Sequence, residues 1–357
     1  MNPRWFSIGV ILFFLSGCAS APQKVSQAPR AALFFPAPPE EPKLQFLTSF
    51  SSSKDIEQSA SGFSQFVFGK EEASQKPIIK PYGMRVRNGK IFVCDTVANA
   101  IEILNLNDRT FQYFRSQGRQ QLLNPINLDV DDHGQMFIAD ARRGQVLILN
   151  EHGDFVSSIG NKGELKPTDV VVKGGRIYVC DLKSNSVRVY DPNGNTFLYA
   201  IPDAKTAKEG QLFSPANLDV DDQGNIYVSD LGAFNVKKFN AQGELLKVIG
   251  TIGDSPGNFA RPKGIAVDRE GRMFVVDAAF NNVQIFDSEG KLLLFFPETH
   301  DELQLVLPAG ITIDYDHIEF FRPLIDKNFD AQYLVLVASQ YGERKINVFA
   351  FGKKRNP

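Results

Sequence analysis

Three neighbouring stretches of the chain place amide or carboxylate side chains two or four residues after a proline. These residues are Asn127, Asp129, Asp169, Asn217 and Asp219. Residues two apart on a strand lie on the same side of it, so the five side chains are expected to converge. Converging oxygen atoms are the ligands that Ca²⁺ and other hard divalent cations prefer. The pattern therefore predicts a cation site, and the alternative is a water-filled channel lined with hydrogen-bonding groups.

Residues for acid–base or nucleophilic catalysis are sparse. The chain has four histidines, His133, His152, His300 and His317, and the first two stand in the turn sequences DDHG and EHG. The sequence contains no nucleophile elbow, P-loop or Cys-x-x-Cys motif. We therefore expect a binding or scaffold protein, with a metal-dependent channel enzyme as the alternative.

The polar stretches belong to a repeat that runs through most of the chain. Each copy opens with a proline, and these are Pro81, Pro125, Pro167, Pro215, Pro262 and Pro308. Within a copy such as Arg261–Phe296, four short apolar runs are separated by Gly, Asn and Asp, a pattern typical of strands joined by hairpins. A sheet this small needs neighbours like itself to bury its faces. Six copies therefore predict an all-β fold, a six-bladed β-propeller.

Two features of the repeat carry a resemblance to known proteins. The runs IYVSD, VKKF and GELLKVIG within residues 226–250 resemble the NHL-repeat propellers, and the resemblance covers residues 43–352. The Pro-x-Asn and Pro-x-Asp positions are similar to metal-bearing positions of the gluconolactonase-like propellers. This second resemblance implies Ca²⁺ or another divalent cation in the channel and lactonase- or lyase-like chemistry. Propellers also serve as binding and scaffold proteins, so the fold alone does not decide the function.

An aspartate ends the second strand in five copies, and in the sixth Gln340 is expected in its place. The five are Asp95, Asp140, Asp181, Asp230 and Asp277. A carboxylate before a turn accepts hydrogen bonds from backbone N–H groups, so we expect an architectural role. Cys94 and Cys180 precede two of these aspartates in copies that are not adjacent. They are therefore predicted to be buried free thiols rather than a disulfide.

The two ends of the repeat region complement each other. Lys43–Phe50 resembles the fourth strand of a copy, such as Lys291–Phe296, but no first three strands precede it. The sixth copy stops after its third strand, Ile346–Phe351. The N-terminal strand is therefore predicted to complete the last blade and to leave no unmatched edge.

Two insertions interrupt the repeat. A helix is predicted within residues 53–75, because apolar residues recur at helical spacing from Ile56 to Val67. The sixth copy contains an enlarged, aromatic-rich hairpin at residues 317–331. This hairpin predicts an interaction surface, and the alternative is a divergent terminal blade. The surface residues would be Phe320, Phe321 and Arg322.

The first 18 residues are typical of a lipoprotein signal peptide. Arg4 precedes the apolar run Ile8–Leu15, and the following LSGC resembles a lipobox that is cleaved before Cys18. The Cys18 thiol is then expected to carry acyl chains such as palmitate. Ala19 after the cysteine resembles the outer-membrane sorting class. The proline-rich residues 19–42 are expected to form an extended tether.

Charge restricts the possible partners. The net charge is −2, with both signs interspersed, so the chain offers no basis for binding nucleic acid. We expect a monomeric propeller domain that is held at the cell envelope, at the outer membrane, by the lipid on Cys18. The expected partner is another envelope protein or a small ligand.

The anchor can be tested with the variant Cys18→Ser. Without the thiol no acyl chain can be attached, and each buried methylene of such a chain contributes about 0.8 kcal/mol to membrane binding. Wild-type protein should partition with detergent-extracted membranes, and the variant should lose both the lipid and the partitioning. Wild-type protein found free in the periplasm or the medium would contradict the lipobox prediction.

Overall fold

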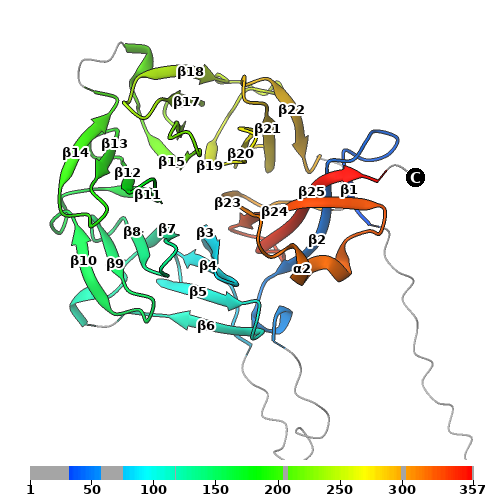
Figure 1. Ribbon diagram of the computed structural model, residues 1–357, viewed down its shortest axis with the longest axis horizontal. Coiled ribbons are helices and arrows are strands. Elements are labelled where there is room, and N and C mark those ends of the chain that lie inside the picture. Colours follow the sequence, from blue (N-terminus) through cyan, green and yellow to red (C-terminus); the bar gives the residue numbers. More distant parts are fainter. Residues whose placement is uncertain (1–31, 58–74, 117, 204–207, 299–302, 356–357) are drawn as a thin grey trace, which may run out of the picture. The chain divides into compact units, whose positions relative to one another are not determined.

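The computed structural model describes residues 32–57, 75–116, 118–203, 208–298 and 303–355. Six antiparallel sheets in this part of the chain are arranged as blades around a centre (Figure 1). The all-β, six-bladed propeller predicted from the repeat is confirmed. No helix among these residues combines the length and apolarity that are needed to cross a bilayer.

Blades 1 to 5 each contain four strands, which follow the chain order from one edge of the sheet to the other. Blade 1 is β3 (Pro81–Arg87), β4 (Lys90–Asp95), β5 (Ala100–Asn105) and β6 (Thr110–Phe114). Blade 2 is β7 (Pro125–Val130), β8 (Met136–Asp140), β9 (Gln145–Leu149) and β10 (Phe155–Ile159). Blade 3 is β11 (Pro167–Lys173), β12 (Arg176–Asp181), β13 (Ser186–Tyr190) and β14 (Phe197–Ile201). Blade 4 is β15 (Pro215–Val220), β16 (Ile226–Asp230), β17 (Asn235–Phe239) and β18 (Leu245–Ile249). Blade 5 is β19 (Pro262–Val267), β20 (Met273–Asp277), β21 (Asn282–Phe286) and β22 (Leu292–Phe296).

Blade 6 joins the two ends of the chain. It contains β23 (Pro308–Asp314), β24 (Phe329–Ser339), β25 (Ile346–Lys354), β2 (Leu44–Phe50) and β1 (Phe34–Phe35). Strand β2 pairs antiparallel with β25, and Leu44 lies opposite Phe351 (Figure 1). The predicted closure of the ring by the N-terminal strand is therefore confirmed.

The propeller begins earlier in the sequence than expected. Strand β1 pairs with β2, and the buried Phe35 ring packs against the rings of Phe296 and Phe349, with centroids 6.1 Å away in each case. Residues 34–35 therefore belong to blade 6, and the extended tether expected over residues 19–42 is wrong for that part. Cys18 and residues 19–31 lie outside the described residues.

The repeated aspartates do what the sequence predicted. In blade 1, Asp95 Oδ2 accepts hydrogen bonds from the backbone N–H groups of Ile79 and Lys80, at 2.7 and 2.8 Å. Its Oδ1 accepts from Val97 and Ala98, at 2.9 and 2.7 Å. The carboxylate thus ties the turn after the second strand to the segment that enters the first strand. Equivalent buried carboxylates occur at Asp140, Asp181, Asp230 and Asp277.

Blade 6 lacks this carboxylate, and the pairing register corrects the alignment of its strand. The opening Pro308 lies opposite Ser339, as Pro81 lies opposite Asp95. Ser339, and not Gln340, is therefore the equivalent residue. Its hydroxyl accepts hydrogen bonds from the N–H of Val306 and from the Asn347 side-chain amide, both at 3.3 Å.

Apolar side chains fill the space between adjacent blades. One cluster joins Val187 and Val189 of blade 3 to Leu218 and Phe239 of blade 4, and all four are buried. Each blade therefore depends on its neighbours for burial of both faces, as the small size of the sheets predicted. Cys94 and Cys180 are buried free thiols, which confirms that prediction.

The two insertions differ in part from expectation. Ser53–Asp55 forms a 3₁₀ turn, and residues 58–74, over which the helix was predicted to extend, lie outside the described residues. The loop between β23 and β24 contains helix α2 (Ile318–Phe321) and a 3₁₀ turn (Arg322–Leu324).

The predicted surface in that loop is wrong for Phe321. This residue is 1% exposed and packs against the ring of Phe50 at 6.3 Å. Phe320 is half-buried beneath the guanidinium of Arg109. Of the three predicted surface residues only Arg322 is exposed, and its guanidinium pairs with the Glu319 carboxylate at 2.6 Å. Phe321 therefore stabilises the closing blade instead of presenting a docking surface.

Ring closure can be tested by truncation. A chain that begins at residue 32 keeps β1 and β2, whereas one that begins at residue 51 uncovers β25 and removes buried side chains including Phe35, Leu44 and Phe50. Each such side chain contributes about 1.5–3 kcal/mol when fully buried. We expect the shorter chain to lose several kcal/mol of unfolding free energy in urea titrations.

The chain that begins at residue 32 is the control and should unfold at the same urea concentration as the mature protein. Equal midpoints for both truncated chains would contradict a stabilising role for the closing strand.

Candidate functional site

The innermost strands of blades 2, 3 and 4 position the five residues predicted to bind a cation. Asn127 and Asp129 lie on β7, Asp169 on β11, and Asn217 and Asp219 on β15. All are buried except Asp219, which is half-buried. The structure therefore brings these side chains to the channel side of three consecutive blades, as expected from the alternation along the strands.

Each of the three carboxylates links its own strand to the next blade. The second oxygen of each accepts a backbone N–H of the neighbouring inner strand, in the pairs Asp129–Val172 at 2.7 Å, Asp169–Leu218 at 2.9 Å and Asp219–Val267 at 2.8 Å. The first oxygen accepts the N–H of the residue that follows in the chain, at 2.8, 2.8 and 2.9 Å. Both oxygens of each group are therefore committed to backbone donors, which is an architectural role.

The small residues of the other blades have an equally structural cause. A Cβ atom on Gly310 would lie 2.1 Å from the carbonyl oxygen of Tyr82, and one on Gly264 would lie 2.4 Å from that of Ala309. A Cβ on Gly83 would meet the Asn127 amide at 1.8 Å. Neighbouring backbones approach too closely there for any side chain. The one-sided distribution of polar residues thus follows from packing.

Arg85 supplies the positive charge of this region. Its Nε lies 2.8 Å from Asp129 Oδ1, and its side chain is 24% exposed. Burial disfavours the charged guanidinium, but the carboxylates of Asp129, Asp219 and Asp169 outweigh this and raise the pKa of Arg85. Sequence reasoning missed this role. The available signal was that Arg85 occupies the repeat position of Asp129 and Asp219.

Burial is the largest influence on the pKa of two carboxyl groups of the channel. It raises the pKa of Asp169 to about 7, against the opposing effects of the Leu218 N–H, Arg85 and the Asn217 amide. Burial likewise raises the pKa of Asp219. Such groups resist ionisation even with hydrogen-bond donors in place.

The donor set is a poor fit for a cation. Among the described residues, no group of three or more His, Cys, Asp or Glu side chains is arranged to hold a metal ion. Backbone N–H groups and the Arg85 guanidinium already approach the carboxylates. The metal site at Asn127, Asp129, Asp169, Asn217 and Asp219 stays a prediction, which the titration described below tests.

A cavity of about 480 Å³ opens at the ends of the inner strands, and we call it the channel-mouth cavity. All six blades contribute to its lining, through residues that include Arg87, Asp132, Lys173, Asp222, Arg269 and Tyr315. Arg85, Asp129 and Asp219 also line it. Exposed ion pairs connect neighbouring blades at its rim, Arg87–Asp132 at 3.0 Å and Lys173–Asp222 at 2.7 Å. Among the described residues, the lining contains seven carboxylates, four basic side chains and no histidine.

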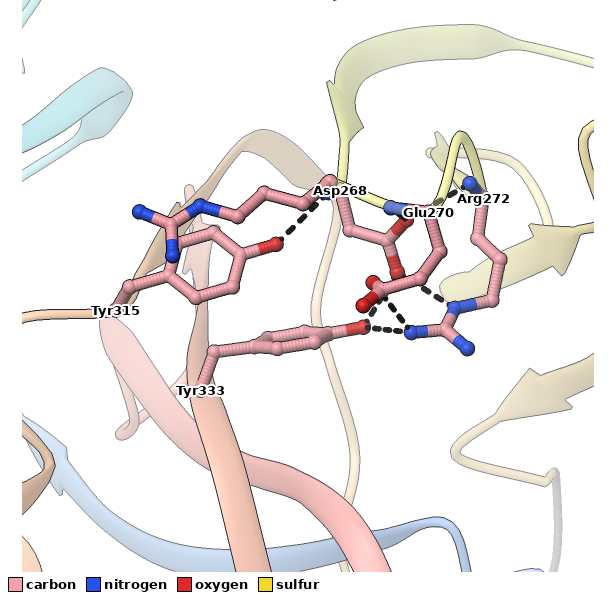
Figure 2. A network of polar contacts seen from close by, with 6 residues as sticks. Asp268, Glu270, Arg272, Tyr315 and Tyr333 are labelled. Atoms are coloured by element: carbon pink, nitrogen blue, oxygen red, sulfur yellow. Dashed lines mark hydrogen bonds and ion pairs between the residues drawn. The ribbon is translucent and has the colours of Figure 1, made fainter.

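A polar network fixes the wall of this cavity where blade 5 meets blade 6 (Figure 2). The buried Asp268 carboxylate accepts hydrogen bonds from the Tyr333 hydroxyl at 2.7 Å and from Arg272 Nε at 2.6 Å. Burial and the charge of Asp268 raise the pKa of Tyr333, so the phenol remains a neutral donor. On the cavity side, the Arg269 guanidinium lies 4.0 Å from the centre of the Tyr315 ring.

The fold places the protein in the class of six-bladed β-propellers. This class includes both binding proteins and enzymes. The sequence matches no protein-family profile, and no curated protein is significantly similar to it. Similar solved structures include a protein of unknown function from Bacteroides thetaiotaomicron, with 15% identity and a TM-score of 0.58 over 87% of this chain and 76% of that chain. A gluconolactonase from Xanthomonas campestris has 15% identity and a TM-score of 0.55 over 87% and 98%. A virginiamycin B lyase from Staphylococcus aureus has 12% identity and a TM-score of 0.52 over 76% and 95%. At such identities the likeness establishes the fold alone.

The role of Arg85 can be tested with Arg85→Met. The change leaves the buried carboxylates of Asp129 and Asp169 and the half-buried one of Asp219 without their counter-charge. We expect a loss of about 2–4 kcal/mol of unfolding free energy at pH 8, slightly below the cost of breaking a fully buried pair. Removing the guanidinium raises the pKa of Asp219 further above its unfolded value. The folded state then binds the proton more tightly than the unfolded state, so the loss shrinks as the pH falls towards about 4.

Urea unfolding at pH 5 and pH 8, with Arg322→Met as an exposed-arginine control, measures this effect. The same titrations, repeated with Ca²⁺ on chelator-treated protein, should leave the wild-type midpoint unchanged. A Ca²⁺-dependent rise in the wild type, lost in Asp169→Ala, would instead support the predicted cation site.

Proposed function

We propose that this protein is a non-enzymatic binding protein of the cell envelope, anchored by a lipid on Cys18, which holds its partner at the channel-mouth cavity. The observation that carries the proposal is the state of the charged groups in the channel. The cavity is preformed by all six blades, and its deepest carboxylates are already paired with Arg85 or with backbone N–H groups. Such an arrangement favours recognition over chemistry.

Catalysis would need a group that is free to move a proton or to attack a substrate. Burial raises the pKa of Asp169 to about 7, but this carboxyl accepts three hydrogen bonds and does not line the cavity. The described histidines also lie elsewhere. His133 and His152 are exposed, and His317 Nδ1 lies 2.9 Å from Asp314 Oδ1.

The charge of the cavity favours a cationic partner group. Its seven carboxylates outnumber its four basic side chains, and a concave surface with one dominant sign concentrates the opposite charge. The rim pairs Arg87–Asp132 and Lys173–Asp222 are partly exposed and contribute at most about 1 kcal/mol each. A basic loop of an envelope protein can therefore exchange with them at little cost.

A metal-dependent lactonase or lyase is the second candidate, favoured by the propeller fold shared with a gluconolactonase and a virginiamycin B lyase. This function would require a cation among the channel carboxylates, where Arg85 now lies. The Ca²⁺ titration of the preceding subsection distinguishes the two candidates.

Site-specific photo-crosslinking tests the proposed binding site. A photoreactive residue at Asp132, whose side chain is 86% exposed at the cavity rim, should give a discrete crosslinked partner in intact cells. The matched control is the same residue at Val97, which is 56% exposed in the turn at the other end of blade 1. The product should weaken when Asp222→Asn is added, because the cavity then loses one carboxylate.

Crosslinks of equal yield from both positions, or none from Asp132, would contradict the assignment. A product that persists in Cys18→Ser protein would place the partner in the periplasm but leave the cavity assignment supported.

A further inference from the structure

Lys263 is a buried lysine at the opposite end of the channel from the channel-mouth cavity. It is the second residue of β19, whereas the cavity lining on that strand begins at Ala266. Its exposed fraction is 6%. The equivalent positions of the other blades carry uncharged side chains, Tyr82, Ile126, Thr168, Ala216 and Ala309. The architecture of the propeller therefore does not require an ammonium group here.

The Lys263 ammonium has no polar partner among the described residues. The ammonium lies over the ring of Tyr82 in blade 1, whose centre is 4.8 Å from Nζ. Burial, reinforced by the charges of Arg261 and Lys80, lowers the pKa of Lys263 to about 8. A cation over an aromatic ring recovers only part of the cost of burying a charge.

The charges of two further cations, Arg261 and Lys80, act on Lys263, and neither cation has an ion pair with a described residue. Arg261 is exposed, and Lys80 Nζ lies 5.1 Å from the centre of the Tyr341 ring. The repeated carboxylates of blades 5 and 1, Asp277 and Asp95, are buried and accept hydrogen bonds from backbone N–H groups, including those of Arg261 and Lys80. Among the described residues, no carboxylate forms an ion pair with Lys263, Lys80 or Arg261.

We propose that Lys263, Lys80 and Arg261 form a binding site for an oxyanion, the carboxylate or phosphate group of a small ligand. An oxyanion would supply the hydrogen-bond acceptor that the Lys263 ammonium lacks, in a partly desolvated place where a charge-assisted hydrogen bond is strong. The ring of Tyr82 would pack against the remainder of the ligand. The site is separate from the channel-mouth cavity and does not depend on the function proposed there.

Thermal unfolding with inorganic phosphate and with acetate, at ionic strength balanced by chloride, tests the site. Both anions stabilise proteins generally through exclusion from the surface, so the measured quantity is the additional rise in Tm over a control variant. We expect wild-type protein and Lys247→Met, which removes a lysine paired with Glu289 on the outer strand of blade 4, to show equal rises with the preferred anion. Lys263→Met should show a smaller rise. In chloride alone it should be at least as stable as wild type, because it removes a buried unpaired charge.

Equal rises in all three proteins would overturn the proposal. A larger rise with phosphate assigns a phosphate ligand, and a larger rise with acetate assigns a carboxylate. If Lys263→Met does not fold, amine labelling of the wild type decides. Phosphate or acetate at a hundredfold excess over Kd should slow acylation of Lys263 about a hundredfold and leave Lys247 unaffected. Unchanged labelling of Lys263 would also overturn the site.

Discussion

The architecture depends on one buried interaction that recurs around the ring, a carboxylate that accepts backbone N–H groups. A buried N–H without an acceptor costs about 1–3 kcal/mol, and blades 1 to 5 each have more than one at the junction between the second-strand turn and the entering segment. Asp95 and its four equivalents satisfy them. The loops at that end can therefore vary in length and composition, because the carboxylate holds their common base in place.

The same principle operates in the channel, where it limits chemistry. Asp129, Asp169 and Asp219 connect consecutive inner strands, and the guanidinium of Arg85 offsets the accumulated negative charge. Side chains used in this way stabilise the ring but are not free to react. The two ends of the channel differ in charge: the channel-mouth cavity is rich in carboxylates, whereas Lys263, Lys80 and Arg261 are cationic.

Blade 6 is the point at which the repeat is broken and repaired. It has Ser339 where the other blades have aspartate, and it takes its outer strands from the start of the propeller. Other contacts compensate for this: Tyr333 binds Asp268 of blade 5, and Phe35 and Phe321 fill space beside the closing strands. Asp268, which borders the cavity, is thereby joined to blade 6 through the Tyr333 hydroxyl (Figure 2).

The sequence by itself determined the propeller, its number of blades, the closure by Lys43–Phe50 and the role of the repeated aspartates, because each follows from local periodicity and turn chemistry. Only the tertiary structure decided what the channel residues do. Whether Asp169 meets a cation, a water molecule or the N–H of Leu218 depends on distances between blades, which no spacing along the chain encodes. The charge balance with Arg85 and the isolation of Lys263 arise in the same way, since both join residues that only the closed ring brings together.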